Sequence, residues 1–284
     1  MCANTFGTSY GLIIIGVVFC VMYSVEILLE VGGDVVQVMK EIGMGKVSTW
    51  AMLAAPKTGV NGLVFNSCIA NFGQLVISLA YVPYNRMFTI FSGAWEWESY
   101  AKNRKALRVT AKPRGEQRST YFLSLPYRIA VPLLISSGVL HWLVSQAIFL
   151  VVLDYRAYDP RSQSWTTVYS ESVKSNTEIG IKNGTFFRCG FSPLATIILL
   201  AAVFLMFIGL FFRGWWQLNM TMPVAGNCSA AIAAACHLPP GENGQETSIS
   251  KVQWGATGYS DGGMGHCAFS MFEVVAPQEG FLYE

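Results

Sequence analysis

Residues 192–212 read SPLATIILLAAVFLMFIGLFF and contain no charged side chain. A membrane-spanning helix needs about 20 mostly apolar residues to cross roughly 30 Å of hydrocarbon. Residues 11–29, 62–82 and 128–153 are also long and apolar enough to span. The sequence therefore predicts an all-α membrane protein, a four-span transmembrane helical bundle over residues 1–212. A short irregular cytoplasmic C-terminal tail, residues 213–284, is expected to follow it.

The composition agrees with this class. Hydrophobic residues make up 52% of the 284 residues and charged residues only 13%, whereas a typical soluble domain has about 25% charged residues. This excludes a disordered or coiled-coil chain and disfavours an ordinary soluble globule. A cleaved signal peptide is the weaker interpretation of residues 11–29, because residues 1–9 hold no Lys or Arg and the apolar run is too long.

The basic residues predict the orientation, because Lys and Arg close to span ends stay in the cytoplasm. Residues 86–128 carry nine basic and three acidic side chains, a balance of +6. Residues 30–59 carry three of each, and residues 154–191 carry five basic and four acidic side chains. With four spans, we expect loop 86–128 and both termini to be cytoplasmic.

A glycosylation motif points the same way. Asn183 begins the sequon Asn-Gly-Thr, which can be modified only on the lumenal side. It falls in a loop that the charge distribution already assigns to that side. We therefore expect a glycosylated multi-pass protein of the secretory pathway or plasma membrane, with its C-terminus in the cytoplasm.

The tail has two basic and six acidic residues, a balance of −4. At about 70 residues it is short for a domain with its own core, so we expect it to pack against the cytoplasmic span ends and to dock on the basic loop. It also collects five soft metal ligands: Cys228, Cys236, His237, His266 and Cys267.

Zinc takes four such ligands in tetrahedral geometry. The spacing here, C-x7-CH-x28-HC, lacks the short Cys pairs that make a zinc motif specific. Small apolar positions on an Ala-rich helix account equally well for Cys228 and Cys236. We therefore expect no cofactor, with zinc as the alternative.

Polar side chains also occur within the predicted spans, where ionisable groups cost several kcal/mol. Those on the second and third spans recur at helical spacing and form one polar stripe on each. The stripes either line a solute or proton path or hydrogen-bond the helices together at roughly 0.6–2 kcal/mol per contact, which is the commoner case. The set comprises Glu26, Asn66, Asn71, Gln74, His141, Ser145 and Gln146.

The motifs of common enzymes are missing from the sequence. It has no P-loop, no G-x-S-x-G and no H-E-x-x-H, so we predict no catalytic residue and do not favour an enzyme. The basic loop borders two spans, which makes anionic lipid headgroups a nearer partner than nucleic acid, at about 1 kcal/mol per basic residue. A homo-oligomer or a partner membrane protein stays open.

Three long stretches and one short one carry a resemblance to a protein family. They are NFGQLVISLAYVPYNRMFT from Asn71, LRVTAKPRGEQRSTYFLSLPYRIAVPLLISSGVLHWLVSQAIFLVVLDYR from Leu107, and MPVAGNCSAAIAAACHLPP from Met222 with GHCAFS from Gly265. Together they resemble a family of fungal multi-pass membrane proteins of unknown function, over most of residues 60–284. The resemblance implies a fungal source and a polytopic membrane location but no activity. Members are generally longer, so we expect a truncated member or a fragment.

Three hypotheses about function remain, and we give them in order of preference. A non-enzymatic membrane component or accessory protein, in one version beside a secondary-metabolite pathway, fits the composition best. A small-molecule or ion transporter subunit would use the polar faces of spans two and three. A membrane metal or redox protein would use the Cys/His cluster of the tail.

Overall fold

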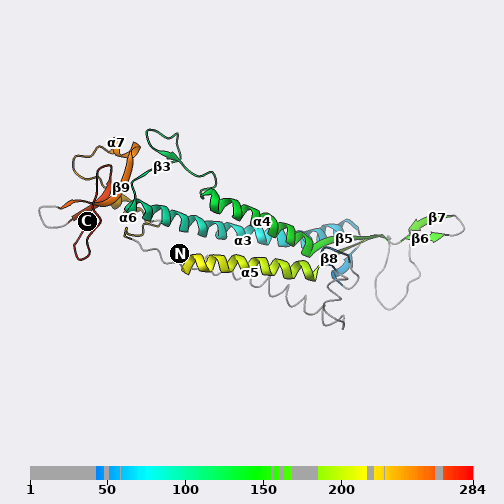
Figure 1. The fold of residues 1–284 in the computed structure, drawn as a ribbon. Coiled ribbons are helices and arrows are strands. Elements are labelled where there is room, and N and C mark those ends of the chain that lie inside the picture. Colours follow the sequence, from blue (N-terminus) through cyan, green and yellow to red (C-terminus); the bar gives the residue numbers. More distant parts are fainter. Residues whose placement is uncertain are drawn as a thin grey trace. The chain divides into compact units, whose positions relative to one another are not determined.

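The computed structural model contains three long apolar helices among the residues that it describes (Figure 1). The predicted first span, residues 11–29 with Glu26, and the sequon at Asn183 lie outside the residues that it describes. The described residues are 43–47, 51–57, 59–154, 156–159, 163–167, 185–215, 221–226, 228–259 and 265–283.

Helices α3 (Gly59–Lys102), α4 (Tyr127–Ala147) and α5 (Pro193–Trp215) are each long and apolar enough to cross a membrane. Many of their apolar side chains are exposed, among them Phe72, Leu134 and Phe204. Exposed apolar surface on this scale is unfavourable in water and suits hydrocarbon. The chain is thus a helical, membrane-associated protein.

Helix α3 is much longer than the predicted span 62–82. Its 44 residues extend for roughly 66 Å at 1.5 Å per residue, about twice the hydrocarbon thickness. Pro83 lies inside it without ending it. Residues 91–102, which belong to the basic loop 86–128 of the charge analysis, continue α3.

Helix α4 is shorter than predicted, and the expected boundary at residue 153 is wrong. The helix ends at Ala147, and residues 148–154 form strand β5 (Ile148–Asp154). The run Ile-Phe-Leu-Val-Val is rich in side chains that favour strands, and a full antiparallel ladder with strand β8 (Thr185–Phe191) satisfies its backbone. The 21 helical residues left still span about 32 Å.

Two compact units divide the chain, and helix α3 contributes to both. Unit 1 comprises Met1–Pro83 and Leu134–Arg213. Its sheet has the strand order β1-β8-β5, with β1 (Met52–Lys57) antiparallel to β8. A two-stranded ribbon, β6 (Arg156–Asp159) with β7 (Ser164–Thr167), follows β5 along the chain.

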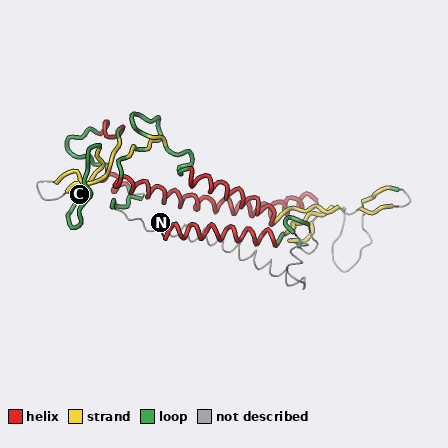
Figure 2. The backbone as a smooth tube through the Cα atoms, in the orientation of Figure 1, coloured by secondary structure: helices red, strands yellow, loops and turns green. Residues whose placement is uncertain are grey.

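Unit 2 comprises Tyr84–Leu133 and Gly214–Glu284. Its sheet has the order β10-β9-β2 and is built from β2 (Lys105–Ala106), β9 (Lys251–Tyr259) and β10 (Gly265–Ser270). Short helices α6 (Ser229–Ala235) and α7 (Gly244–Ile249) precede β9 along the chain. Strands β3 (Arg108–Val109) and β4 (Arg118–Ser119) form a short parallel pair. Figure 2 shows these strands among long loops.

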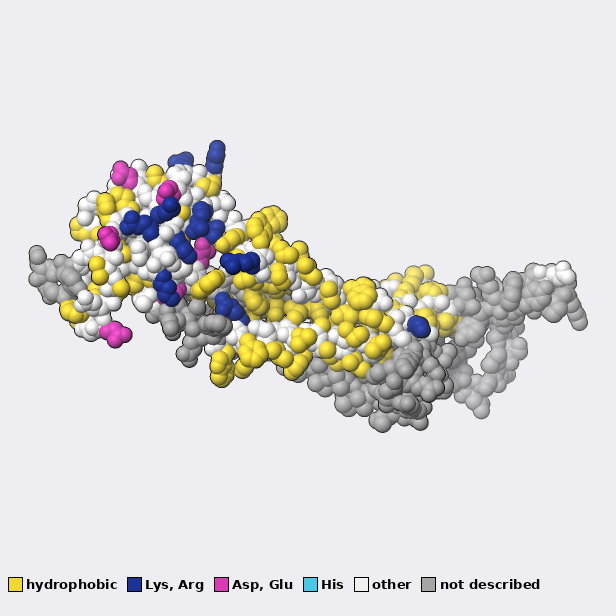
Figure 3. All heavy atoms as spheres, in the orientation of Figure 1, with side chains coloured by type: hydrophobic (Ala, Val, Ile, Leu, Met, Phe, Trp, Pro, Cys, Tyr) yellow, Lys and Arg dark blue, Asp and Glu magenta, His cyan; other side chains and the backbone are white. Residues whose placement is uncertain are grey.

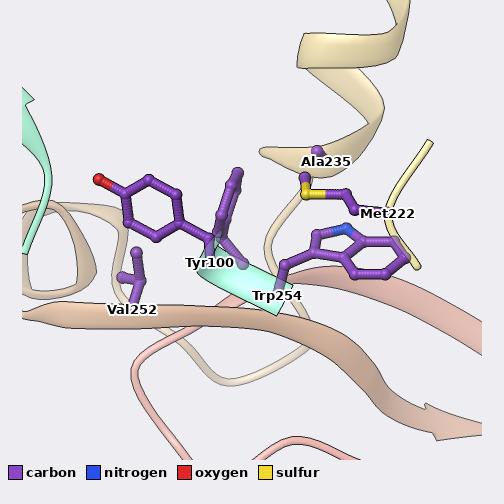
Figure 4. Packing of buried hydrophobic residues seen from close by; sticks show 6 residues of the cluster. Tyr100, Met222, Ala235, Val252 and Trp254 are labelled. Atoms are coloured by element: carbon purple, nitrogen blue, oxygen red, sulfur yellow. The ribbon is translucent and has the colours of Figure 1, made fainter. Parts of the chain in front are cut away.

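The core of unit 2 joins segments far apart in sequence. Tyr100 of α3 and Phe269 of β10 meet edge to face, with ring centroids 5.6 Å apart. Figure 4 shows Tyr100 beside Val252, and Met222 and Ala235 beside Trp254. Burying these large side chains supplies the hydrophobic free energy that a 70-residue tail alone does not gain.

Two expectations about the fold therefore need correction. The chain is not all-α, since the described residues contain two three-stranded sheets and two two-stranded ones. Nor is the tail simply irregular, because residues 228–270 contain two helices and two strands. Some of these pairings give no local signal because the partners are distant in sequence, as with Lys105 and Val252 across β2 and β9.

Candidate functional site

The polar stripes of α3 and α4 meet at one pair, Gln74 and His141. The Gln74 amide nitrogen donates to the His141 carbonyl oxygen at 3.0 Å, and the Gln74 Oε1 lies 2.5 Å from His141 Nδ1. Since an amide oxygen only accepts, Nδ1 carries the proton in this arrangement. At neighbouring Gly73, a Cβ would lie 2.8 Å from Val144, so glycine allows the close approach of the helices there.

The other predicted polar side chains mostly bond within their own helix. Asn71 donates to the Ser67 carbonyl at 2.8 Å, and Ser145 donates to the Trp142 carbonyl at 2.6 Å. Gln146 contacts the Ser145 hydroxyl at 3.4 Å. These contacts satisfy hydrogen-bonding groups locally and bring no further ionisable side chain into the stripe.

Asn66 forms hydrogen bonds with strand β8 in the sheet of unit 1. Its side chain is fully buried (0% exposed) and donates to the carbonyls of Gly62 at 2.9 Å and Phe187 at 3.0 Å. The Cys189 thiol donates to the Asn66 carbonyl at 3.2 Å. Burial raises the pKa of the Cys189 thiol, so this cysteine is a packing residue with little thiolate at neutral pH.

The structure brings together two of the five predicted metal ligands. The rings of His237 and His266 meet edge to face, with centroids 5.3 Å apart, and His266 Nε2 lies 3.0 Å from the His237 carbonyl oxygen. Within the described residues, no group of three or more His, Cys, Asp or Glu is placed to hold a metal ion. Burial raises the pKa values of the Cys236 and Cys267 thiols.

A buried carboxylate organises unit 2. Glu98, on α3, is 2% exposed. It accepts hydrogen bonds from the Thr221 backbone N–H at 3.2 Å, from the Thr221 hydroxyl at 3.0 Å and from the Met222 N–H at 3.4 Å. Lys102, one turn further along α3, lies 3.4 Å away and supplies the opposite charge. This group ties the start of the tail to the end of α3.

The loop and tail of unit 2 dock through backbone and core contacts more than through charge. Beyond the β2–β9 ladder, the Glu116 N–H donates to the Ile249 carbonyl at 2.8 Å, and the Gln117 side chain donates to the Ser248 carbonyl at 2.8 Å. The ion pair Lys251–Glu116, 3.4 Å, is half-exposed, and such pairs contribute little. Its signs are also opposite to the expected match of a basic loop with an acidic tail.

Arg108 anchors the end of this loop. Its guanidinium donates to Glu96 of α3 at 2.6 Å and to the Ser119 carbonyl at 3.1 Å. It also bonds the Tyr121 hydroxyl at 2.5 Å and lies 3.9 Å from the centroid of that ring. These contacts fix Tyr121 just before the chain enters α4.

Five other basic side chains within residues 104–128 are exposed, and Figure 3 shows a gathering of Lys and Arg on the surface. Glu116 is the one exposed acidic side chain in the same segment. We call this set the basic surface. It consists of Arg104, Lys112, Arg114, Arg118 and Arg128.

Sequence reasoning missed Glu98 and Arg108. Both lie in a segment whose excess of basic residues is its strongest sequence signal. The i, i+4 spacing of Glu98 and Lys102 is visible and is typical of a helical ion pair. The partner of Glu98, Thr221, lies 123 positions away, and no local pattern indicates such a contact.

Residues 4–262 match the model of a domain of unknown function, DUF8419. The chain belongs to this family. No curated protein and no solved structure matches it. The DUF8419 match covers α3, α4, α5 and the whole of β9, so it includes parts of both units, but it brings no activity and no catalytic residue.

Proposed function

We propose that this DUF8419 chain is a non-enzymatic membrane component, an accessory protein that holds a folded domain at the cytoplasmic surface of its membrane. Unit 2 is that domain. The observation that carries the proposal is its shared core, in which Tyr100 of α3 packs with Trp254 and Phe269 of the tail. A tail folded onto the loop between two spans suits a structural or docking role.

The order of elements supports the proposed topology. Loop 103–126 lies between α3 and α4, and two crossings, through α4 and α5, return the chain to the same side before the tail begins. The β2–β9 pairing joins that loop to that tail, which requires both to lie on one side of the membrane. The contact is therefore compatible with α4 and α5 both crossing.

The sheet of unit 1 is compatible with the same scheme. Strand β1 precedes α3, β5 follows α4, and β8 precedes α5. If all three helices cross, these strands share the side opposite to loop 103–126, and they pair in one sheet. The sequon Asn183 belongs to that side in the proposed topology.

The charge distribution supports the choice of sides. The +6 balance of residues 86–128 assigns the loop, and with it unit 2, to the cytoplasm. With residues 11–29 as a fourth span, both termini are cytoplasmic. We propose residence in the secretory pathway or plasma membrane on this basis.

The hydrogen bonds of Gln74 and His141 favour an accessory protein over a transporter. Gln74 uses both its nitrogen and its oxygen on His141, and Gly73 brings the helices close. A pair satisfied in this way is typical of helix packing in a membrane.

The test is purification of the full chain from its native membranes in mild detergent. We expect a stoichiometric membrane partner with the wild type, lost from Trp254→Ala, while the variant remains membrane-inserted. A chain that purifies alone in both cases, or that by itself moves solutes across liposomes, would overturn the proposal.

A further inference from the structure

An exposed apolar turn precedes α4. The Ser124 N–H donates to the Tyr121 carbonyl at 3.1 Å, closing a tight turn over residues 121–124. Its two central side chains point away from the protein: Phe122 is 83% exposed and Leu123 43% exposed. We call this segment the Phe122 turn.

The turn is fixed on both sides, so its exposure is built into the fold. On one side Tyr121 is held by Arg108, which is itself bonded to Glu96 of α3. On the other side Leu125 is 1% exposed. The contacts of Tyr121 on one side and the burial of Leu125 on the other thus hold Phe122 and Leu123 in an exposed position.

The surroundings of the turn are those of a membrane interface. The turn runs directly into α4, whose first residue, Tyr127, is 62% exposed. Aromatic side chains are favoured at this level of a bilayer. Arg118 and Arg128 flank the turn and are exposed, and residues 117–153 contain no Asp or Glu.

We infer that the Phe122 turn inserts into the bilayer beside α4 and that Arg128 and Arg118 bind the headgroups of anionic phospholipids there. Phe122 and Leu123 reach the acyl-chain boundary, while the guanidinium groups stay at the phosphate level, as in interfacial anchors. We infer a lipid surface as the partner because such a surface combines an anionic headgroup layer, which suits the two arginines, with an apolar interior, which suits Phe122 and Leu123. The inference rests on α4 crossing the membrane, as proposed above.

The experiment uses the full chain in nanodiscs of 70% phosphatidylcholine and 30% phosphatidylserine. A benzoylphenylalanine photoprobe replaces Phe122, and a clickable tag is carried by one or the other lipid. Leu134→benzoylphenylalanine, within α4, reports whether that helix is in the bilayer. Thr110→benzoylphenylalanine, exposed in the loop, is the control outside the turn.

We expect lipid adducts at positions 122 and 134 and at least severalfold fewer at position 110. At position 122 we expect the ratio of phosphatidylserine to phosphatidylcholine adducts to exceed the ratio of the two lipids in the bilayer by about fivefold, the effect of one basic residue at the surface. Arg128→Gln should lower this enrichment toward parity without lowering adducts at position 134.

Adducts at position 134 without adducts at position 122 would overturn the insertion of the turn and leave the proposed span intact. Absence of adducts at position 134 would overturn the span itself and the proposed function with it. Adducts at position 122 without phosphatidylserine enrichment would overturn the headgroup site.

Discussion

At the scale of single residues, Glu98 ties the tail of unit 2 to helix α3. Its carboxylate is buried and accepts three hydrogen bonds from Thr221 and Met222. Charge-assisted bonds of this kind each contribute about 1.5–3 kcal/mol. A charge without these partners would be costly at such a site.

We predict that Glu98→Gln lowers the free energy of unfolding of unit 2 by roughly 1.5–3 kcal/mol, because the amide is a weaker acceptor than the carboxylate. Thermal unfolding of the full chain in detergent, with protease cleavage within residues 214–284 as the readout, measures this loss of stability. Glu116→Gln is the matched control, since Glu116 makes a half-exposed ion pair worth at most about 1 kcal/mol. Equal effects of the two substitutions would contradict the assignment.

The tail cysteines give a second test at this scale. Burial raises the pKa of the Cys267 thiol, so its thiolate fraction at neutral pH is low, and the thiolate is the species that reacts. We predict that iodoacetamide labels Cys267 more slowly than exposed Cys228 at about pH 7.5. The Cys267 rate should rise as the pH is raised further and the thiol ionises. Peptide mass spectrometry measures both rates, and equal labelling near neutral pH would show that Cys267 is not sheltered.

At the scale of elements, the Gln74–His141 pair joins α3 to α4. We predict that His141→Leu leaves membrane insertion intact and lowers the stability of the solubilised chain by roughly 0.6–2 kcal/mol, the usual value of such a contact in a membrane. Ser78→Ala is the control, because Ser78 donates only to the Gln74 carbonyl of its own helix. If His141→Leu were as stable as Ser78→Ala, the pair would not be a packing contact.

The elements also show how far a sequence pattern predicts this fold. Length and apolar character are local properties, so the amino-acid sequence alone predicts spans at α3, α4 and α5. It does not predict strand β5, because the apolar run of this strand continues that of α4 and only its pairing with β8 separates the two. The predicted span 62–82 leaves out the last turns of α3, which are held by contacts of Tyr100 and Glu98 with the tail.

At the scale of the whole molecule, each sheet joins segments that a spanning topology brings to one side of a membrane. Residues 105–106 pair with residues 251–252, and residues 52–53 pair with residues 189–190. Neither pairing has a local signal in the sequence. Net charge predicted that the loop and tail would meet, but hydrophobic burial and backbone pairing, not attraction between a basic and an acidic segment, provide the contact.

The central claim is that the loop and the tail form one cytoplasmic domain. Protease treatment of sealed microsomes that carry the full chain with a C-terminal tag tests it most directly, with glycosylation of Asn183 reporting the lumenal side. The account predicts that the tag is removed without detergent while the glycan at Asn183 stays protected and disappears in Asn183→Gln. A tag that resists protease until the microsomes are opened would place the tail in the lumen and contradict the account.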